Sequence, residues 1–232
     1  MVEAQHRVST LKVVDTLEEQ ALLEELIEET KAVIPLECRH LHYLLATPFR
    51  YAAVYPKGSR FRRAGRTAGV YYASEEVDTA VAEMAFYRLL FFAESPDTPW
   101  PQNAAEYTAF AAEFRTSAAI DLTRPPLDRN HVVWTDLIDY SGCQALADSA
   151  RQAEIAAIRY QSVRDPGHRA NLALLSCIAF SRPKPVERRT WRIRLSAFGV
   201  QAICEHPEQR ISFGSEAFAN DPRLAAMRWQ RS

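Results

Sequence analysis

The stretch that decides the fold runs from Gly69 to Phe92 and reads Gly-Val-Tyr-Tyr-Ala-Ser-Glu-Glu-Val-Asp-Thr-Ala-Val-Ala-Glu-Met-Ala-Phe-Tyr-Arg-Leu-Leu-Phe-Phe. Its first part, residues 70–73, predicts a short buried strand because aromatic and β-branched side chains favour strands. A helix is expected to follow at once and to reach about Phe92, with Ser74 as its N-terminal cap. The helix has an apolar stripe, formed by Val77, Val81 and Met84. The stretch therefore indicates a fold that mixes strands and helices.

Glu83 is the most informative single residue of this helix. Between Thr79 and Ala93 the helix is apolar apart from Glu83 and Arg88. No cation lies three or four positions from Glu83, so no local ion pair can form. A carboxylate in such surroundings needs a distant partner, water in a cleft, or a proton. Two roles stay open: a functional group in a cleft, or a structural ion pair with a distant arginine.

Arg60 lies in the segment Gly58-Ser-Arg-Phe61, which precedes the strand that leads into this helix. We therefore expect Arg60 and Glu83 to face each other across one strand-to-helix unit. Guanidinium groups bind phosphates with two hydrogen bonds, so the arrangement favours an anionic substrate such as a dinucleotide. The alternative is that four arginines form a basic surface loop, namely Arg60, Arg62, Arg63 and Arg66.

Length and composition limit the class of protein. A chain of 232 residues, 47% of them hydrophobic, is long enough for one large core. The formal net charge of -1 gives no reason to expect direct binding to nucleic acid or to an anionic membrane. No apolar run approaches the roughly 18 residues of a membrane span, and no secretory leader is visible. We therefore expect a cytoplasmic protein.

Metal binding and the common catalytic motifs are not expected. The four cysteines are widely separated, which argues against a zinc ribbon or a dithiol redox motif and favours reduced cysteines. Cys38, His40 and His42 have a spacing that resembles a metal site, but no compact second group of ligands accompanies them. The GxSxG elbow, the P-loop and the GxGxxG fingerprint are all absent.

The N-terminal region predicts an amphipathic helix that Pro35 ends. Asp15 and Glu18 are spaced as a capping box. Its apolar face is formed by Leu17, Leu22, Leu23, Leu26 and Ile27. Residues 1–31 carry eight acidic and three basic side chains, so the helix offers an acidic surface for protein contacts. One open alternative is therefore a noncatalytic module that binds a nucleotide or a partner protein.

The rest of the chain alternates strands and helices. Further strands are expected at 114–122, 158–163, 171–177 and 191–197. Ser141 and Gln144 are spaced as a second capping box for a helix that reaches about Ala153. The alternation in 158–163 places Tyr160 and Ser162 on one face of their strand. The last 30 residues show no clear pattern, and no convincing domain boundary is visible.

Four segments, in this order, resemble the RES domain family. They are Tyr43-Leu-Leu-Ala-Thr-Pro-Phe-Arg-Tyr51, Gly58-Ser-Arg-Phe61, Gly69-Val-Tyr-Tyr-Ala-Ser74 with Glu83, and Ile158-Arg-Tyr-Gln-Ser-Val-Arg164. The resemblance spans about residues 41–175. The family is named for an arginine, a glutamate and a serine, which match Arg60, Glu83 and Ser162.

The resemblance implies an α+β fold similar to that of ADP-ribosyltransferases, with a split, bent β-sheet flanked by helices and an extra N-terminal helix. It implies a helical extension over residues 1–40, a catalytic domain over 41–200, and a C-terminal extension over 201–232 packed on the same domain. RES proteins are typically toxins that consume NAD, and an Xre-type helix-turn-helix antitoxin neutralises them. The expected protein is a toxin that cleaves NAD at the nicotinamide-ribose bond, with NAD as substrate and no metal.

The resemblance also implies the site residues. The catalytic residues would be Glu83, Arg60 and Ser162, and the residues that bind NAD would be Arg50, Tyr51 and Tyr72, with Tyr71 as an adjacent candidate. In these roles the arginines hold phosphates, the tyrosines pack on nicotinamide or ribose, Ser162 bonds the substrate, and Glu83 stabilises the sugar cation. The sequence Ser59-Arg-Phe61 departs from the family's usual Gly-Arg-Trp, so the geometry of this loop stays open. Water, phosphate or a host protein could accept the ADP-ribose, so a mono-ADP-ribosyltransferase stays an alternative.

Overall fold

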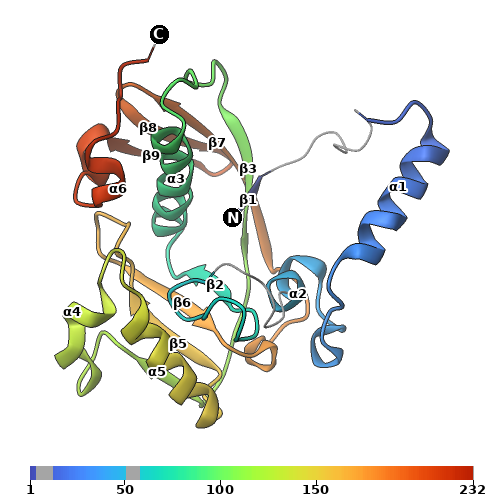
Figure 1. The fold of residues 1–232 in the computed structure, drawn as a ribbon, viewed down its shortest axis with the longest axis vertical. Coiled ribbons are helices and arrows are strands. Elements are labelled where there is room, and N and C mark those ends of the chain that lie inside the picture. Colours follow the sequence, from blue (N-terminus) through green and yellow to red (C-terminus); the bar gives the residue numbers. More distant parts are fainter. Residues whose placement is uncertain (4–12, 51–57, 232) are drawn as a thin grey trace.

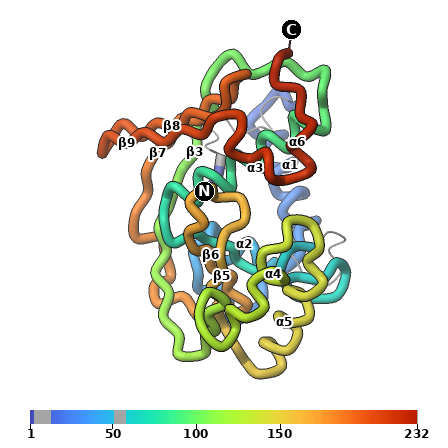
Figure 2. Tube along the Cα trace, turned by 90° about the vertical axis from the view of Figure 1, so that its left-hand side faces the viewer, coloured from blue at the N-terminus to red at the C-terminus, as the bar shows by residue number. Residues whose placement is uncertain are grey.

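Two β-sheets form the framework of the computed structural model, which describes residues 1–3, 13–50 and 58–231. The five-stranded sheet has the order β1 (Val2–Glu3), β3 (Ala105–Ala111), β7 (Glu187–Ser196), β8 (Gly199–Glu205) and β9 (Glu208–Gly214). The four-stranded sheet has the order β2 (Tyr71–Ser74), β6 (Ala170–Leu174), β5 (Ala157–Gln161) and β4 (Ala119–Asp121). In both views the larger sheet lies above the smaller one (Figure 1 and Figure 2). The predicted α+β class is confirmed, and its strands are divided between two sheets.

Helix α3 (Val77–Glu94) connects the sheets, because it follows β2 directly and packs on the five-stranded sheet (Figure 1). Its side chains Val81, Phe86 and Leu89 are buried against Trp191 of β7. The prediction that Ser74 caps this helix is wrong. Glu76 stands at the cap position without a side-chain hydrogen bond, and the Ser74 hydroxyl donates to Asn171 Oδ1 of β6 at 2.7 Å.

The four-stranded sheet is covered by short helices. Helix α2 (Tyr43–Arg50) belongs to one apolar cluster with β2, whereas α4 (His131–Trp134) and α5 (Ser141–Gln152) belong to another with β5. The capping box predicted at Ser141 is not formed, because Ser141 is already the first helical residue and its backbone N–H donates to Asp139 Oδ1 at 2.8 Å.

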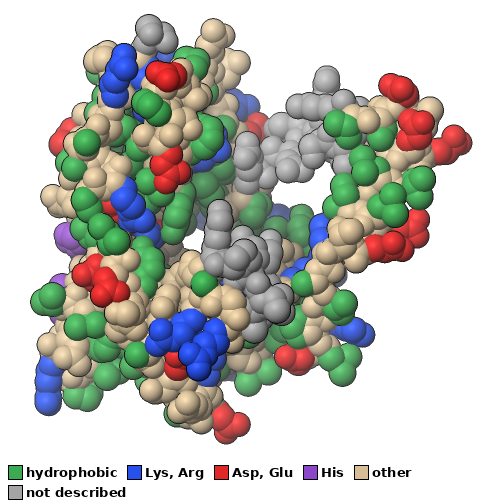
Figure 3. Space-filling model, in the orientation of Figure 1, with side chains coloured by type: hydrophobic (Ala, Val, Ile, Leu, Met, Phe, Trp, Pro, Cys, Tyr) green, Lys and Arg blue, Asp and Glu red, His purple; other side chains and the backbone are tan. Residues whose placement is uncertain are grey.

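Helix α1 (Leu17–Thr30) stands apart from the body of the protein (Figure 1 and Figure 3). The predicted helix is present, but its capping box is one position later than expected and joins Thr16 to Glu19. None of its residues is buried. Its described tie to the body is an ion pair between Glu28 and Arg50. The apolar face of α1 is therefore open to solvent.

The sequence did not predict β3, β8 and β9. Strand β9 lies in the stretch without a clear pattern and β8 reaches into it, and both continue the sheet of β7 by antiparallel pairing. Their inward positions hold small or mixed side chains such as Ala202 and Cys204, so the alternation is weak in the sequence. The predicted strand over 114–122 is shortened to β4, because the segment before it pairs elsewhere through the bridge between Phe114 and Phe180.

The cysteines differ from the expectation of reduced side chains. Cys38 and Cys177, 139 positions apart, form a disulfide, whereas Cys143 and Cys204 are free and buried. Such a pairing depends on tertiary structure and leaves no local motif. Within the described part of the chain, no helix is both long and apolar enough to span a bilayer. The C-terminal segment contains the short helix α6 (Pro222–Ala225), which packs near α3.

Candidate functional site

A cavity of about 510 Å³ lies where β2, α3 and the segment around Arg60 meet. One acid, Glu83, lines it. Three arginines also line it, namely Arg60, Arg164 and Arg223. Four tyrosines line it as well, namely Tyr72, Tyr87, Tyr140 and Tyr160. Charged and aromatic groups from the four-stranded sheet, from α3 and from the segments around them therefore converge on one hollow.

Glu83 is held by three donors from β6 and from the chain that follows β5. Its Oε1 accepts hydrogen bonds from Ser162 Oγ and from Asn171 Nδ2, both at 2.7 Å. Its Oε2 accepts one from Arg164 Nη1 at 3.1 Å. The Glu83 side chain is 20% exposed to solvent. Glu83 therefore forms an ion pair with a distant arginine and at the same time faces the cavity.

Ser162 is fully buried and does not line the cavity. Its hydroxyl donates to Glu83, and its oxygen accepts from the backbone N–H groups of Arg164 at 3.3 Å and Asp165 at 3.1 Å. The single hydroxyl proton is therefore committed to Glu83. The structure places Ser162 as a support for Glu83 rather than in contact with a ligand in the cavity.

Arg60 lines the cavity but is largely buried, so the alternative of an exposed basic loop is wrong for this residue. Its Nη1 donates to the Trp134 carbonyl at 2.7 Å and its Nη2 to the Asp136 carbonyl at 2.8 Å. Its guanidinium carbon lies 4.6 Å from the centre of the Tyr140 ring. Arg60 thus fixes the segment before α5 while placing positive charge at the cavity wall.

The two neighbouring tyrosines of β2 point to opposite sides, as alternate strand residues do. Tyr72 lines the cavity, and its hydroxyl lies 2.8 Å from Ser59 Oγ and accepts from the Phe61 backbone N–H at 3.0 Å. Burial of this hydroxyl raises the pKa of Tyr72 to about 12, although 38% of the residue is exposed. Tyr71 instead packs edge-on against Phe180, with ring centres 5.0 Å apart. Tyr72 and not Tyr71 belongs to the cavity.

Arg50 does not line the cavity. Arg50 ends α2 and pairs with Glu28 of α1, and it is absent from the lining. Tyr51 lies outside the described residues. The structure thus brings Arg60, Tyr72, Glu83 and Ser162 together and leaves Arg50 apart.

Asn171 and Arg164 are site residues that the sequence analysis missed. Asn171 is a polar residue on β6, whose five residues are all buried, and this contrast is a signal that could have revealed it. Arg164 closes the fourth segment of the family resemblance. Burial lowers the pKa of Arg164, but Glu83, Tyr87 and Tyr140 outweigh that effect and hold it above its ordinary value.

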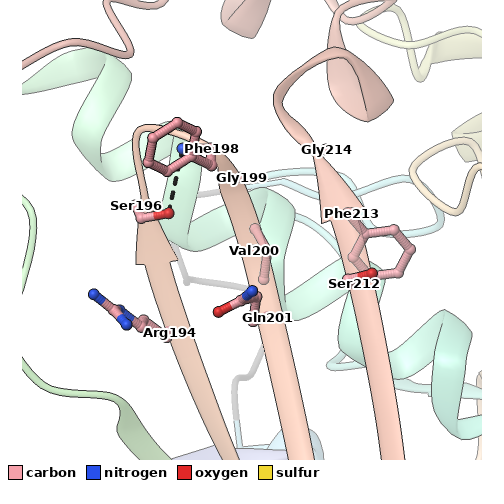
Figure 4. A pocket seen from close by; sticks show the side chains of 9 residues that line it. All are labelled: Arg194, Ser196, Phe198, Gly199, Val200, Gln201, Ser212, Phe213 and Gly214. Atoms are coloured by element: carbon pink, nitrogen blue, oxygen red, sulfur yellow. Dashed lines mark hydrogen bonds between the residues drawn. The ribbon is translucent and has the colours of Figure 1, made fainter.

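Two other cavities of similar size lack the combination of an acid, arginines and tyrosines that is found at Glu83. A cavity of about 450 Å³ between β7, β8 and β9 is lined by Arg194, Phe198, Phe213 and small or polar residues, without an acid or a tyrosine (Figure 4). A mostly apolar cavity of about 440 Å³ adjoins the site, since Tyr72 and Ser74 line both. Among the described residues, no group of three or more His, Cys, Asp or Glu side chains could hold a metal. The candidate site is therefore the cavity at Glu83.

Comparison with known proteins agrees with the four segments quoted above. The model of the RES domain matches residues 34–196, which is more than half of the chain and includes Arg60, Glu83 and Ser162. No curated protein matches the chain. On the extent of the domain match, the chain belongs to the RES domain family.

Proposed function

We propose that the protein cleaves NAD at the bond between nicotinamide and ribose. The observation that carries this proposal is the Glu83 carboxylate, which is fixed by Ser162, Asn171 and Arg164 and faces a cavity lined by arginines and tyrosines. Membership of the RES domain family supports the same reading. NAD would be the substrate, and the reaction would need no metal.

The proposed chemistry needs a fixed negative charge beside the ribose. When the bond between C1′ and the ring nitrogen breaks, its electron pair leaves with nicotinamide, which becomes neutral. Positive charge then spreads over C1′ and the ring oxygen of the sugar. A preorganised carboxylate stabilises such a cation most effectively where water is largely excluded. Glu83 would also accept a hydrogen bond from a ribose hydroxyl.

The surroundings would bind the remainder of the dinucleotide. Tyr72 and Tyr87 offer ring faces for the flat nicotinamide, and guanidinium groups offer donors for its phosphates. The adjoining apolar cavity, which shares Tyr72 with the site, would suit the other end of the molecule. The lining holds three arginines against one acid, which also favours an anionic acceptor such as phosphate over a neutral one.

In the cell such an activity would lower the NAD pool and arrest growth. The proposed protein is thus a toxin, restrained by an Xre-type helix-turn-helix antitoxin. Transfer of ADP-ribose to a host protein would use the same Glu83 and differ in the acceptor. A noncatalytic module would share the cavity but have no use for the fixed carboxylate.

Nicotinamide release by the purified protein tests the proposal. NAD is incubated with wild type and Glu83→Gln, with and without inorganic phosphate, and the products are separated by chromatography. Wild type is expected to release nicotinamide and Glu83→Gln to release at least about a hundredfold less. Radiolabelled NAD that leaves its label on a protein band would favour the transferase. Absence of nicotinamide release under every condition would contradict the proposal.

A further inference from the structure

Arg223 enters the cavity from a segment that lies outside the RES domain match. The match ends at residue 196, whereas Arg223 belongs to α6 near the C-terminus. Leu224 and Met227 anchor this segment in the apolar cluster around α3. The anchoring holds the Arg223 side chain at the cavity that Glu83 lines.

The three arginines of the cavity differ in how many donors they have left. Arg60 gives both terminal nitrogens to backbone carbonyls. Arg164 gives its Nη1 to Glu83 and its Nη2 to the Tyr140 hydroxyl at 2.8 Å. Arg223 gives Nε and Nη2 to the Asp221 carboxylate at 2.8 Å and 2.6 Å. Its Nη2 also donates to the Leu137 carbonyl at 3.2 Å. Its Nη1 has no acceptor among the described residues, so both N–H donors of this nitrogen are left for a ligand.

Arg164 and Arg223 also bring two positive charges to one aromatic ring. Their guanidinium carbons lie 4.7 Å and 5.0 Å from the centre of the Phe86 ring. The positive charge of Arg164 disfavours the positive charge of Arg223, and an anion near both offsets this repulsion. Glu83 and Asp221 balance part of this charge, but each carboxylate is directed to one guanidinium only. A ligand with a phosphoryl group would relieve the remainder.

We propose that Arg223 binds a phosphoryl group of the ligand, so that the C-terminal segment completes the site. This inference rests on the proposed function for the identity of the ligand. The phosphoryl group could belong to the dinucleotide or be free inorganic phosphate. In either case the guanidinium donates through Nη1 while Asp221 keeps its orientation fixed.

Three probes test the inference by titration calorimetry on the full-length protein. ADP-ribose carries the two phosphates of NAD without the bond to be cleaved, nicotinamide riboside carries none, and inorganic phosphate is the free anion. Arg223→Gln is expected to weaken binding of ADP-ribose, or of inorganic phosphate if that is the source, by about tenfold. Binding of nicotinamide riboside should not change. Arg228→Gln, at an exposed arginine of the same segment, should alter none of the three.

A second variant separates this role from a purely structural one. Asp221→Asn keeps an acceptor for the Arg223 backbone N–H, which bonds Asp221 Oδ1 at 3.0 Å, but removes the balancing charge. If Arg223 binds an anion, Asp221→Asn strengthens phosphoryl binding while Arg223→Gln weakens it. If the pair only ties α6 in place, both variants weaken all probes alike, and the inference is overturned.

The outcomes also distinguish this inference from the proposed function. Wild type that binds ADP-ribose yet releases no nicotinamide from NAD would contradict the proposed function alone. Equal phosphoryl binding by wild type and Arg223→Gln would overturn the role of Arg223 alone. Wild type that binds none of the three probes would overturn both.

Discussion

Ser162 donates its hydroxyl proton to Oε1 of Glu83 at 2.7 Å, although 79 positions of sequence separate the two residues. Glu83 comes from α3, which packs on the five-stranded sheet, and Ser162 follows β5 of the four-stranded sheet. The hydrogen bond therefore joins the two halves of the fold at the cavity. Two of the three family residues form one unit, in which the serine fixes the position of the acid.

Removal of the Ser162 hydroxyl should slow catalysis more than it weakens binding. Ser162→Ala leaves Glu83 with Asn171 and Arg164, and loss of one hydrogen bond to a charged group corresponds to about a tenfold to hundredfold lower rate. The kcat of nicotinamide release should fall while KM changes little, because Ser162 does not line the cavity. Ser149→Ala, at an exposed serine on α5, is the matched control. A rise in KM at constant kcat would mean that Ser162 contacts the substrate.

Asn171 should matter for its amide donor and not for its shape. Asn171→Asp keeps the size and the acceptor for Ser74, but places a second carboxylate beside Glu83. Two adjacent carboxylates disfavour each other's ionised form, so one takes up a proton at neutral pH. Nicotinamide release should fall further than in Asn171→Ala at pH 8 and recover in part toward pH 5. Wild-type activity of Asn171→Asp at pH 8 would refute this role.

The central strand-to-helix unit of the fold could be predicted from the sequence. The aromatic strand, the apolar helix after it and the isolated acid at Glu83 are local patterns, and the structure contains all three as β2, α3 and the carboxylate of the cavity. The cap of α3 was misplaced, because a serine near a helix start can as well bond a neighbouring strand. Ser74 does so with Asn171.

The partners of Glu83 could not be predicted from the sequence in the same way. Arg164 and Asn171 lie 81 and 88 positions from Glu83, and only the pairing of β2, β6 and β5 brings them near. Arg223 comes from a segment whose periodicity is too weak to read. Arg50, by contrast, was implied as a site residue by the family resemblance, but it forms an ion pair with Glu28 outside the cavity.

The ion pair between Arg164 and Glu83 should stabilise the fold only as a pair. The Arg164 side chain is 9% exposed and that of Glu83 is 20% exposed, so either charge left alone is poorly solvated. Arg164→Met should lower the free energy of unfolding by about 3 kcal/mol. The double variant Arg164→Met with Glu83→Gln should recover part of that loss, because no unpaired charge remains. Urea unfolding of wild type, the two single variants and the double variant measures the coupling energy between Arg164 and Glu83. Additive losses of stability would contradict this coupling.

Acid should loosen the site through Asp165, which ties the chain after β5 to α3. Burial raises the pKa of Asp165, but hydrogen bonds from Arg169, Gly167 and Thr79 outweigh that effect and lower it to about 2. In the unfolded chain an aspartate has a pKa of about 3.9. The folded form thus binds the proton more weakly, so the stability from Asp165 is full above about pH 4 and is lost as the pH falls toward 2.

Asp165→Asn tests this dependence, because it removes the titrating group while keeping the size of the side chain. The variant should be less stable than wild type at pH 7, and the difference between the two should shrink between about pH 4 and pH 2. Thermal unfolding at steps of half a pH unit measures it. Asp148→Asn serves as control, because its pair with Arg63 is one-third exposed and lies on α5, away from the bonds of Asp165. A constant difference between Asp165→Asn and wild type across this range would show that Asp165 does not titrate with unfolding. In that case its bond to Thr79, at 2.8 Å, would hold α3 beside the cavity independently of pH.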